Sequence, residues 1–184
     1  MTQGKQGAVP FLYLLPVFAI ATVFLAAIFR NAWAGDDSYI VFRTIEQLFA
    51  GNGPRWNLID RVQAYTSPLW FWLLCIPRLV SADVYLNAMA VALLLDALLV
   101  LLLYRFFGQL QAWAFALVLL VLSNSFMDYT TAGLEYPLIY LLCAVFFSEY
   151  LQYGKTSGIS SLRRLSIAGG LLLFTRHDLL LTII

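Results

Sequence analysis

A single charge, that of Asp96, interrupts the run VYLNAMAVALLLDALLVLLLY at residues 84–104. At about 1.5 Å of rise per residue, a helix of this length crosses the ~30 Å hydrocarbon core of a bilayer. Further long apolar runs occupy residues 9–29, 110–127, 134–151 and 165–184. The pattern predicts an all-α integral membrane protein with about five transmembrane helices, at about 9–30, 84–105, 110–128, 134–152 and 163–184.

The composition supports this prediction. Hydrophobic residues make up 62% of the 184 residues and charged residues 11%, against averages of about 45–50% and about 25% in ordinary proteins. A small soluble domain is mostly surface and cannot hide so much apolar area. The formal net charge of +1 argues against a nucleic-acid partner, which requires a basic stripe. Cys75 and Cys143 lie in apolar runs, so they suggest neither a disulfide framework nor a zinc site.

The charges that flank the runs predict the topology. Basic residues concentrate on the cytoplasmic side of a membrane. Lys5 precedes the first run, and Arg105 lies between the second and third runs. Between the fourth and fifth runs lie Lys155, Arg163 and Arg164. The N-terminus is therefore predicted to be cytoplasmic, and the connections 31–83 and 128–134 to face outside. The first run is longer than the apolar core of a signal peptide, which predicts a retained helix.

The outer segment 31–83 is expected to contain two interfacial helices. Apolar residues at helical spacing over 38–50 predict an amphipathic helix on the membrane surface, with Asp37 or Ser38 capping its start. The apolar stretch 68–80 is too short to cross a bilayer and predicts a second helix. Arg43 is spaced to pair with Glu46 one turn later.

Acidic and basic residues at the outer side suggest one candidate site. The topology places Asp36, Asp37, Glu135 and Arg176 on the same side of the membrane. Each has a simpler interpretation: Asp36 and Asp37 could cap a helix, Glu135 stands at a favourable helix start, and Arg176 could neutralise Asp178. Charges within a membrane are costly and are usually paired or functional. By the same argument, Asp96 is expected to pair or pack with a polar group in a part of the protein beyond this chain. The sole histidine, His177, has no set of metal ligands.

Six short motifs follow one another between residues 36 and 178. They are Asp36-Asp37-Ser38-Tyr39-Ile40, Gly51-Asn52-Gly53, Asp60-Arg61-Val62, Tyr65-Thr66-Ser67-Pro68-Leu69-Trp70, Gly133-Leu134-Glu135-Tyr136-Pro137 and Thr175-Arg176-His177-Asp178. The series resembles the outer loops of polytopic GT-C glycosyltransferases, and most of all those of bacterial arabinofuranosyltransferases that use a polyprenyl-phosphate arabinose donor. The resemblance implies the N-terminal part of a GT-C-like bundle in the bacterial inner membrane.

The resemblance also implies a reaction. A sugar, with arabinofuranose favoured, would pass from the polyprenyl-phosphate donor to a cell-envelope glycan or glycoprotein acceptor on the outer face. Such transfer requires a carboxylate that activates the acceptor hydroxyl and donors that stabilise the departing phosphate. The catalytic candidates are Asp36 and Asp37, and the candidates for donor or substrate binding are Arg43, Arg61, Tyr65, Glu135, Arg176 and Asp178. The sequence indicates no cofactor with certainty, and a divalent cation held by Asp36, Asp37 and Glu135 stays an open alternative.

Other functions remain open from the sequence. The sugar could be mannose or another hexose, or the chain could be a non-catalytic polyprenyl-lipid flippase, a partner subunit or a membrane segment without a site. The last apolar run stops at Ile184 without a cap or a charge. We therefore expect the chain to be part of a longer protein and to be inactive alone.

Overall fold

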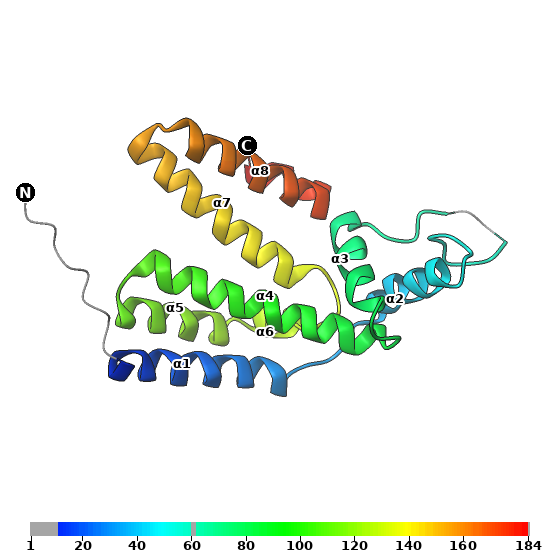
Figure 1. Ribbon diagram of the computed structural model, residues 1–184, viewed down its shortest axis with the longest axis horizontal. Helices are drawn as coiled ribbons and strands as arrows, with labels where there is room; N and C mark the ends of the chain where they lie inside the picture. The colour runs from blue at the N-terminus through cyan, green and yellow to red at the C-terminus, as the bar shows by residue number, and fades with distance from the viewer. Residues whose placement is uncertain (1–10, 60–61, 184) are drawn as a thin grey trace, which may run out of the picture.

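The computed structural model describes residues 11–59 and 62–183, which form helices and no strand (Figure 1). This confirms the predicted all-α class for that part of the chain. The helices are α1 (Phe11–Arg30), α2 (Asp36–Phe49), α3 (Pro68–Arg78), α4 (Val84–Phe107), α5 (Leu110–Leu122), α6 (Asn124–Tyr129), α7 (Tyr136–Thr156), α8 (Ile159–Thr175), the short 3₁₀ helix η1 (His177–Leu179) and α9 (Leu180–Ile183).

Helix α4 is the centre of the bundle and contacts α1, α2, α3, α5 and α7. Helices α7 and α8 run side by side as an antiparallel pair (Figure 1). The short helices α2 and α3 lie together at one end of the bundle, where α1 ends, α4 and α7 begin, and α8 ends (Figure 1). The fold thus brings connecting segments that are distant in sequence to a single end.

Local capping explains where the apolar runs become helices. Asp83 accepts a hydrogen bond from the Leu86 backbone N–H at 2.9 Å and starts α4, which ends where Gly108 adopts a left-handed φ of 64°. The predicted span 110–128 is divided, because Ser123 accepts a hydrogen bond from the Phe126 N–H and starts the separate helix α6. The predicted span 163–184 is interrupted after Thr175, where the backbone becomes extended.

Helix α2 begins two residues before its predicted start and buries its apolar face within the protein. It begins at Asp36, with Gly35 at the N-cap position, so no side chain caps it and Asp36 and Asp37 lie in its first turn. Its apolar residues, Val41, Phe42 and Ile45, are buried in a cluster with residues of α3 and α4. The apolar side of the amphipathic pattern therefore packs against α3 and α4.

Two apolar clusters hold the helices together. One joins α2, α3, α4, α7 and α8 around the fully buried Trp70 and Phe71. The other joins α1, α4 and α5 around Ile28 and Trp113, whose indole N–H donates to the Val100 carbonyl at 3.0 Å. Because a buried indole needs such a partner, this hydrogen bond fixes how α5 lies on α4.

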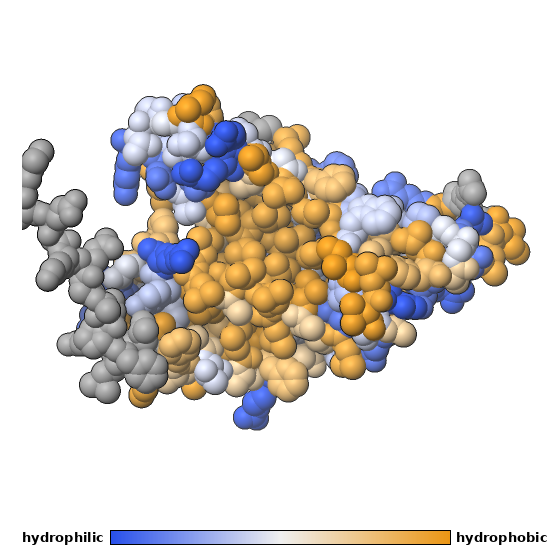
Figure 2. Space-filling model, in the orientation of Figure 1, coloured by the Kyte–Doolittle hydropathy of each residue, from blue (hydrophilic) through white to orange (hydrophobic). Residues whose placement is uncertain are grey.

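Among the described helices, α4 alone is long and apolar enough to cross a membrane. Helices α1 and α5 contribute shorter apolar segments, Leu15–Arg30 and Leu110–Leu122. Length and hydropathy therefore do not establish the five predicted spans. The surface nevertheless carries many exposed apolar side chains, among them Phe18, Val23, Leu101, Phe115 and Leu122, and Figure 2 shows a broad apolar area over the middle of the bundle.

Candidate active site

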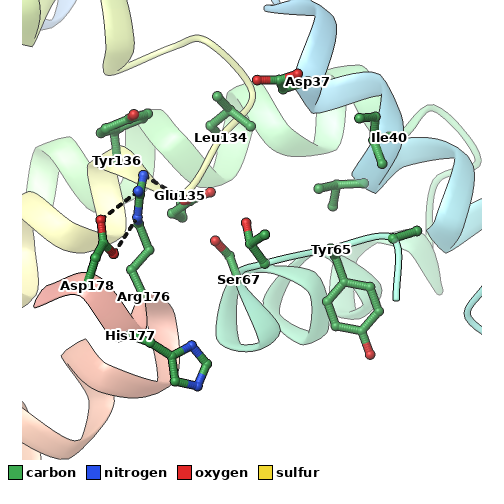
Figure 3. Close-up of a pocket in the computed structure, with 13 residues that line it drawn as sticks. Asp37, Ile40, Tyr65, Ser67, Leu134, Glu135, Tyr136, Arg176, His177 and Asp178 are labelled. Carbon is green, nitrogen blue, oxygen red and sulfur yellow. Dashed lines mark hydrogen bonds and ion pairs between the residues drawn. The ribbon is translucent and has the colours of Figure 1, made fainter. Parts of the chain in front are cut away.

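A pocket of about 630 Å³ opens at the end of the bundle where α2, α3, α7 and α8 meet (Figure 3). Four segments line it. The first turns of α2 contribute Asp37, Ile40 and Val41, and the segment before α3 contributes residues 64–67. Residues 134–136, at the start of α7, and residues 176–178, after the end of α8, complete the lining.

Hydrogen bonds between distant segments position these walls. The Gly35 N–H donates to the Ala132 carbonyl at 2.9 Å, just before α2 begins. The indole N–H of Trp70 in α3 donates to the Gly133 carbonyl at 3.1 Å. The chain before α7 is thereby tied to both α2 and α3, which places Asp37 and Glu135 on the same pocket.

The close approach of α2 to this segment requires a glycine. Gly133 has a φ of +80°, which residues with a Cβ rarely adopt. A Cβ added at Gly133 would lie 2.8 Å from Ser38 Cβ and 2.9 Å from Phe42 Cζ. Any larger residue would therefore push α2 away from the segment that holds Glu135.

Arg176 is shared between two carboxylates at the pocket wall. Its Nε–H donates to Asp178 Oδ1 at 2.9 Å, and its Nη2 donates to Oδ2 at 2.7 Å. Its Nη1 lies 3.6 Å from Glu135 Oε1 (Figure 3). Glu135 is only 5% exposed, and a buried carboxylate needs such a cationic neighbour.

The structure brings together several of the residues proposed from the sequence. Asp37, Tyr65, Glu135, Arg176 and Asp178 all line the pocket. Asp36, although adjacent to Asp37, is exposed and is absent from the lining. Arg61 lies outside the described residues.

Arg43 lies away from the pocket and makes different contacts from those predicted. Its guanidinium lies 4.8 Å from the centre of the Trp56 ring, and its Nε–H donates to the Trp56 carbonyl at 3.1 Å. The predicted pair between Arg43 and Glu46 does not form. Glu46 instead accepts two hydrogen bonds from Arg78 of α3, at 2.8 and 3.0 Å, so this ion pair joins two helices.

The pocket also includes polar residues that the sequence did not single out for this role. They are Thr66, Ser67, Tyr136 and His177. Ser67 and Thr66 stand in the motif that starts α3, and the sequence indicated only their place at a helix start. Their position on a pocket depends on contacts with α7 and α8, which no local pattern reveals.

The candidate cation ligands are not brought together. In residues 11–59 and 62–183, no three Asp, Glu, His or Cys side chains lie close enough to hold a metal ion. Asp37 and Glu135 share the pocket, whereas Asp36 does not line it. The pocket therefore offers carboxylates that could accept a proton from a hydroxyl and one guanidinium that could stabilise an anion.

Comparisons with known proteins agree with the motifs. No family model and no solved structure matches the chain. A terminal β-(1→2)-arabinofuranosyltransferase of Mycobacterium tuberculosis is 35% identical over 138 residues, which cover 68% of this chain and 22% of the relative. A protein of the same name from Corynebacterium glutamicum is 38% identical over 76 residues, which cover 36% of this chain and 11% of the relative.

These relatives confirm the resemblance to arabinofuranosyltransferases that the motifs indicated. The chain spans about a fifth of the length of the mycobacterial relative and about a tenth of that of the corynebacterial one. The matches therefore concern only a part of each relative and not a whole enzyme.

Proposed function

We propose that this chain carries the pocket-forming part of a membrane glycosyltransferase that uses a polyprenyl-phosphate sugar donor, with arabinofuranose as the favoured sugar. The acceptor is a cell-envelope glycan or glycoprotein. The observation that carries the proposal is the single pocket lined by Asp37, Glu135 and Arg176. The similarity to proteins named arabinofuranosyltransferases supports the choice of sugar.

Three of the lining residues have roles in this proposed reaction. Asp37 acts as the base and takes the proton of the acceptor hydroxyl, whose oxygen then bonds to the anomeric carbon. The bond from that carbon to the phosphate oxygen breaks, and Arg176 stabilises the phosphate that leaves. Glu135 orients Arg176 and favours the oxocarbenium-like transition state. Asp37 is preferred over Asp36 because only Asp37 lines the pocket.

We further propose five membrane crossings with the pocket facing the outside of a bacterial inner membrane. The basic residues Arg105 and Lys155 lie close to the ends of α4 and α7, at the opposite end of the bundle from α2 and α3 (Figure 1). This separation of charge fits a cytoplasmic end and an outer end. The exposed apolar side chains between the two ends fit contact with lipid.

The test compares Asp37→Asn with Asp128→Asn in the full-length protein within its native membrane. Both residues are exposed acids close to the same end of the bundle, but Asp128 does not line the pocket. We expect Asp37→Asn to slow transfer from labelled polyprenyl-phosphate arabinose by about 10²- to 10⁴-fold, and Asp128→Asn to transfer at the wild-type rate. Undiminished transfer by the Asp37 variant would show that this residue is not the base. A wild-type protein that moves the donor lipid across the membrane without transferring sugar would support a flippase instead.

A further inference from the structure

The hydroxyl of Ser67 lies at the pocket without a hydrogen-bond partner. Ser67 is only 2% exposed, and its buried Oγ has no hydrogen-bond partner among residues 11–59 and 62–183. Ser67 also lines the pocket. Figure 3 shows it between Tyr65 on one side and the pair of Arg176 and Glu135 on the other.

This arrangement is unusual for a serine at the start of a helix. Ser67 is the N-cap residue of α3, where a serine oxygen normally accepts a hydrogen bond from the backbone two or three residues later. Here the side chain makes no such bond. Because a buried hydroxyl without a partner is destabilising, native proteins seldom retain one without a reason.

The surrounding structure holds the hydroxyl in place. The Ser67 carbonyl accepts a hydrogen bond from the Phe71 N–H at 3.0 Å, so the backbone of Ser67 belongs to the first turn of α3. The ring of Phe71 is fully buried and stacks on that of Tyr65, with centres 4.3 Å apart and planes 6° from parallel. The Ser67 side chain is therefore presented to the pocket from a rigid wall.

We infer that Ser67 Oγ binds a hydroxyl group of the sugar that occupies this pocket, and so helps to determine which sugar is accepted. The inference rests on the proposed function. A serine hydroxyl can both donate and accept, as can the hydroxyl of a sugar. Among the described residues, the lining contains three carboxylates, those of Asp37, Glu135 and Asp178, against the one guanidinium of Arg176. This excess of acidic groups favours a neutral polyol over a phosphate next to Ser67.

A second buried hydroxyl provides the control. Thr131 is 1% exposed and its Oγ1 also lacks a partner, but Thr131 does not line the pocket. Replacing either hydroxyl removes an unpartnered polar group, so Ser67→Ala and Thr131→Val should both fold, with unfolding temperatures equal to or above that of the wild type. Only Ser67→Ala should alter sugar binding.

The experiment measures binding of methyl arabinofuranoside and its monodeoxy derivatives to the full-length protein by calorimetry. We expect Ser67→Ala to weaken binding of the parent glycoside by about threefold to tenfold, and Thr131→Val to leave it unchanged. On the wild type, one deoxy derivative should bind more weakly than the parent glycoside. On Ser67→Ala, that derivative and the parent glycoside should bind equally. The loss of discrimination at one hydroxyl identifies the contact, because a purely structural change would affect all derivatives alike.

The outcomes separate this inference from the proposed function. If Ser67→Ala binds every glycoside as the wild type does, or if the wild type binds none, the inference is wrong. Transfer assays on Asp37→Asn test the reaction independently. If the selective loss of binding occurs in a protein that transfers no sugar, the sugar contact at Ser67 stands and the proposed reaction fails.

Discussion

Thr130 and Asp96 are joined deep in the bundle, where Thr130 Oγ1 lies 2.9 Å from each carboxylate oxygen of Asp96. Both residues are fully buried. The sequence predicted a polar partner for Asp96 beyond this chain. The structure shows instead that Thr130, within the described chain, is that partner. Because Thr130 stands directly after α6, this hydrogen bond anchors the segment that leads to Glu135.

Removing the Thr130 hydroxyl should destabilise the protein. Thr130→Val leaves the buried Asp96 carboxylate without its donor, which costs about 1–3 kcal/mol of unfolding free energy. Thr44→Val is the matched control, because Thr44 is equally buried but donates only to the Ile40 carbonyl of its own helix. Thermal unfolding in detergent measures both variants. Equal losses of stability in the two would contradict a special role for the Asp96 contact.

Replacing Gly133 should disturb the pocket more than a comparable change elsewhere. Gly133→Ala adds a methyl group against Ser38 and Phe42 at a positive φ, and the overpacking should cost about 1–3 kcal/mol beyond the backbone strain. Gly51 has a similar φ of +82° but open space around it. Gly51→Ala should therefore show the strain alone, about 1–2 kcal/mol. Unfolding and sugar transfer should both be measured, and normal transfer by Gly133→Ala would show that the fit of α2 against residue 133 does not shape the site.

The ion pair between Glu46 and Arg78 should contribute little stability. Both side chains are partly exposed, and pairs of this kind contribute about 0.2–1 kcal/mol. A double-mutant cycle on Glu46→Gln and Arg78→Gln should give a coupling energy in that range, smaller at high salt. The same cycle on Glu46 and Arg43 should give a coupling near zero. A larger coupling energy for Glu46 and Arg43 would indicate that the pair predicted from sequence spacing forms in solution.

Arg176 and Asp178 should have opposite effects on donor binding. Arg176→Ala removes the guanidinium that would meet the donor phosphate, and a hydrogen bond to a charged group contributes about 1.5–3 kcal/mol, so KM for the donor should rise by roughly 10-fold or more. Asp178→Asn removes the carboxylate that holds Arg176 at 2.7 Å. Because this frees the guanidinium, KM for the donor should fall. A rise in KM for Asp178→Asn would indicate that the ion pair itself positions Arg176.

The sequence predicted the helices better than the contacts between them. Apolar runs mark most of the helices because burial and membrane insertion both act on composition over many residues. The basic residues that flank the apolar runs predicted that Asp37, Glu135 and Arg176 lie at one end of the bundle, because that prediction depends only on the order of the helices. The predicted partner of Glu46, Arg43, was wrong. Spacing along α2 does not reveal that Arg78 of α3 lies beside Glu46. The buried hydroxyl of Ser67 was missed for the same reason: burial at residue 67 depends on how distant segments pack around it.

The wide separation of the pocket walls along the chain bears on biosynthesis. Asp37 leaves the ribosome early, and Arg176, the one arginine in the pocket lining, follows roughly 140 residues later. At common translation rates this interval is on the order of ten seconds. Until α8 has folded back along α7, the nascent chain carries acidic walls without their counter-ion. The described lining of the pocket is therefore incomplete until α8 is in place, and its acidic residues precede its arginine in synthesis.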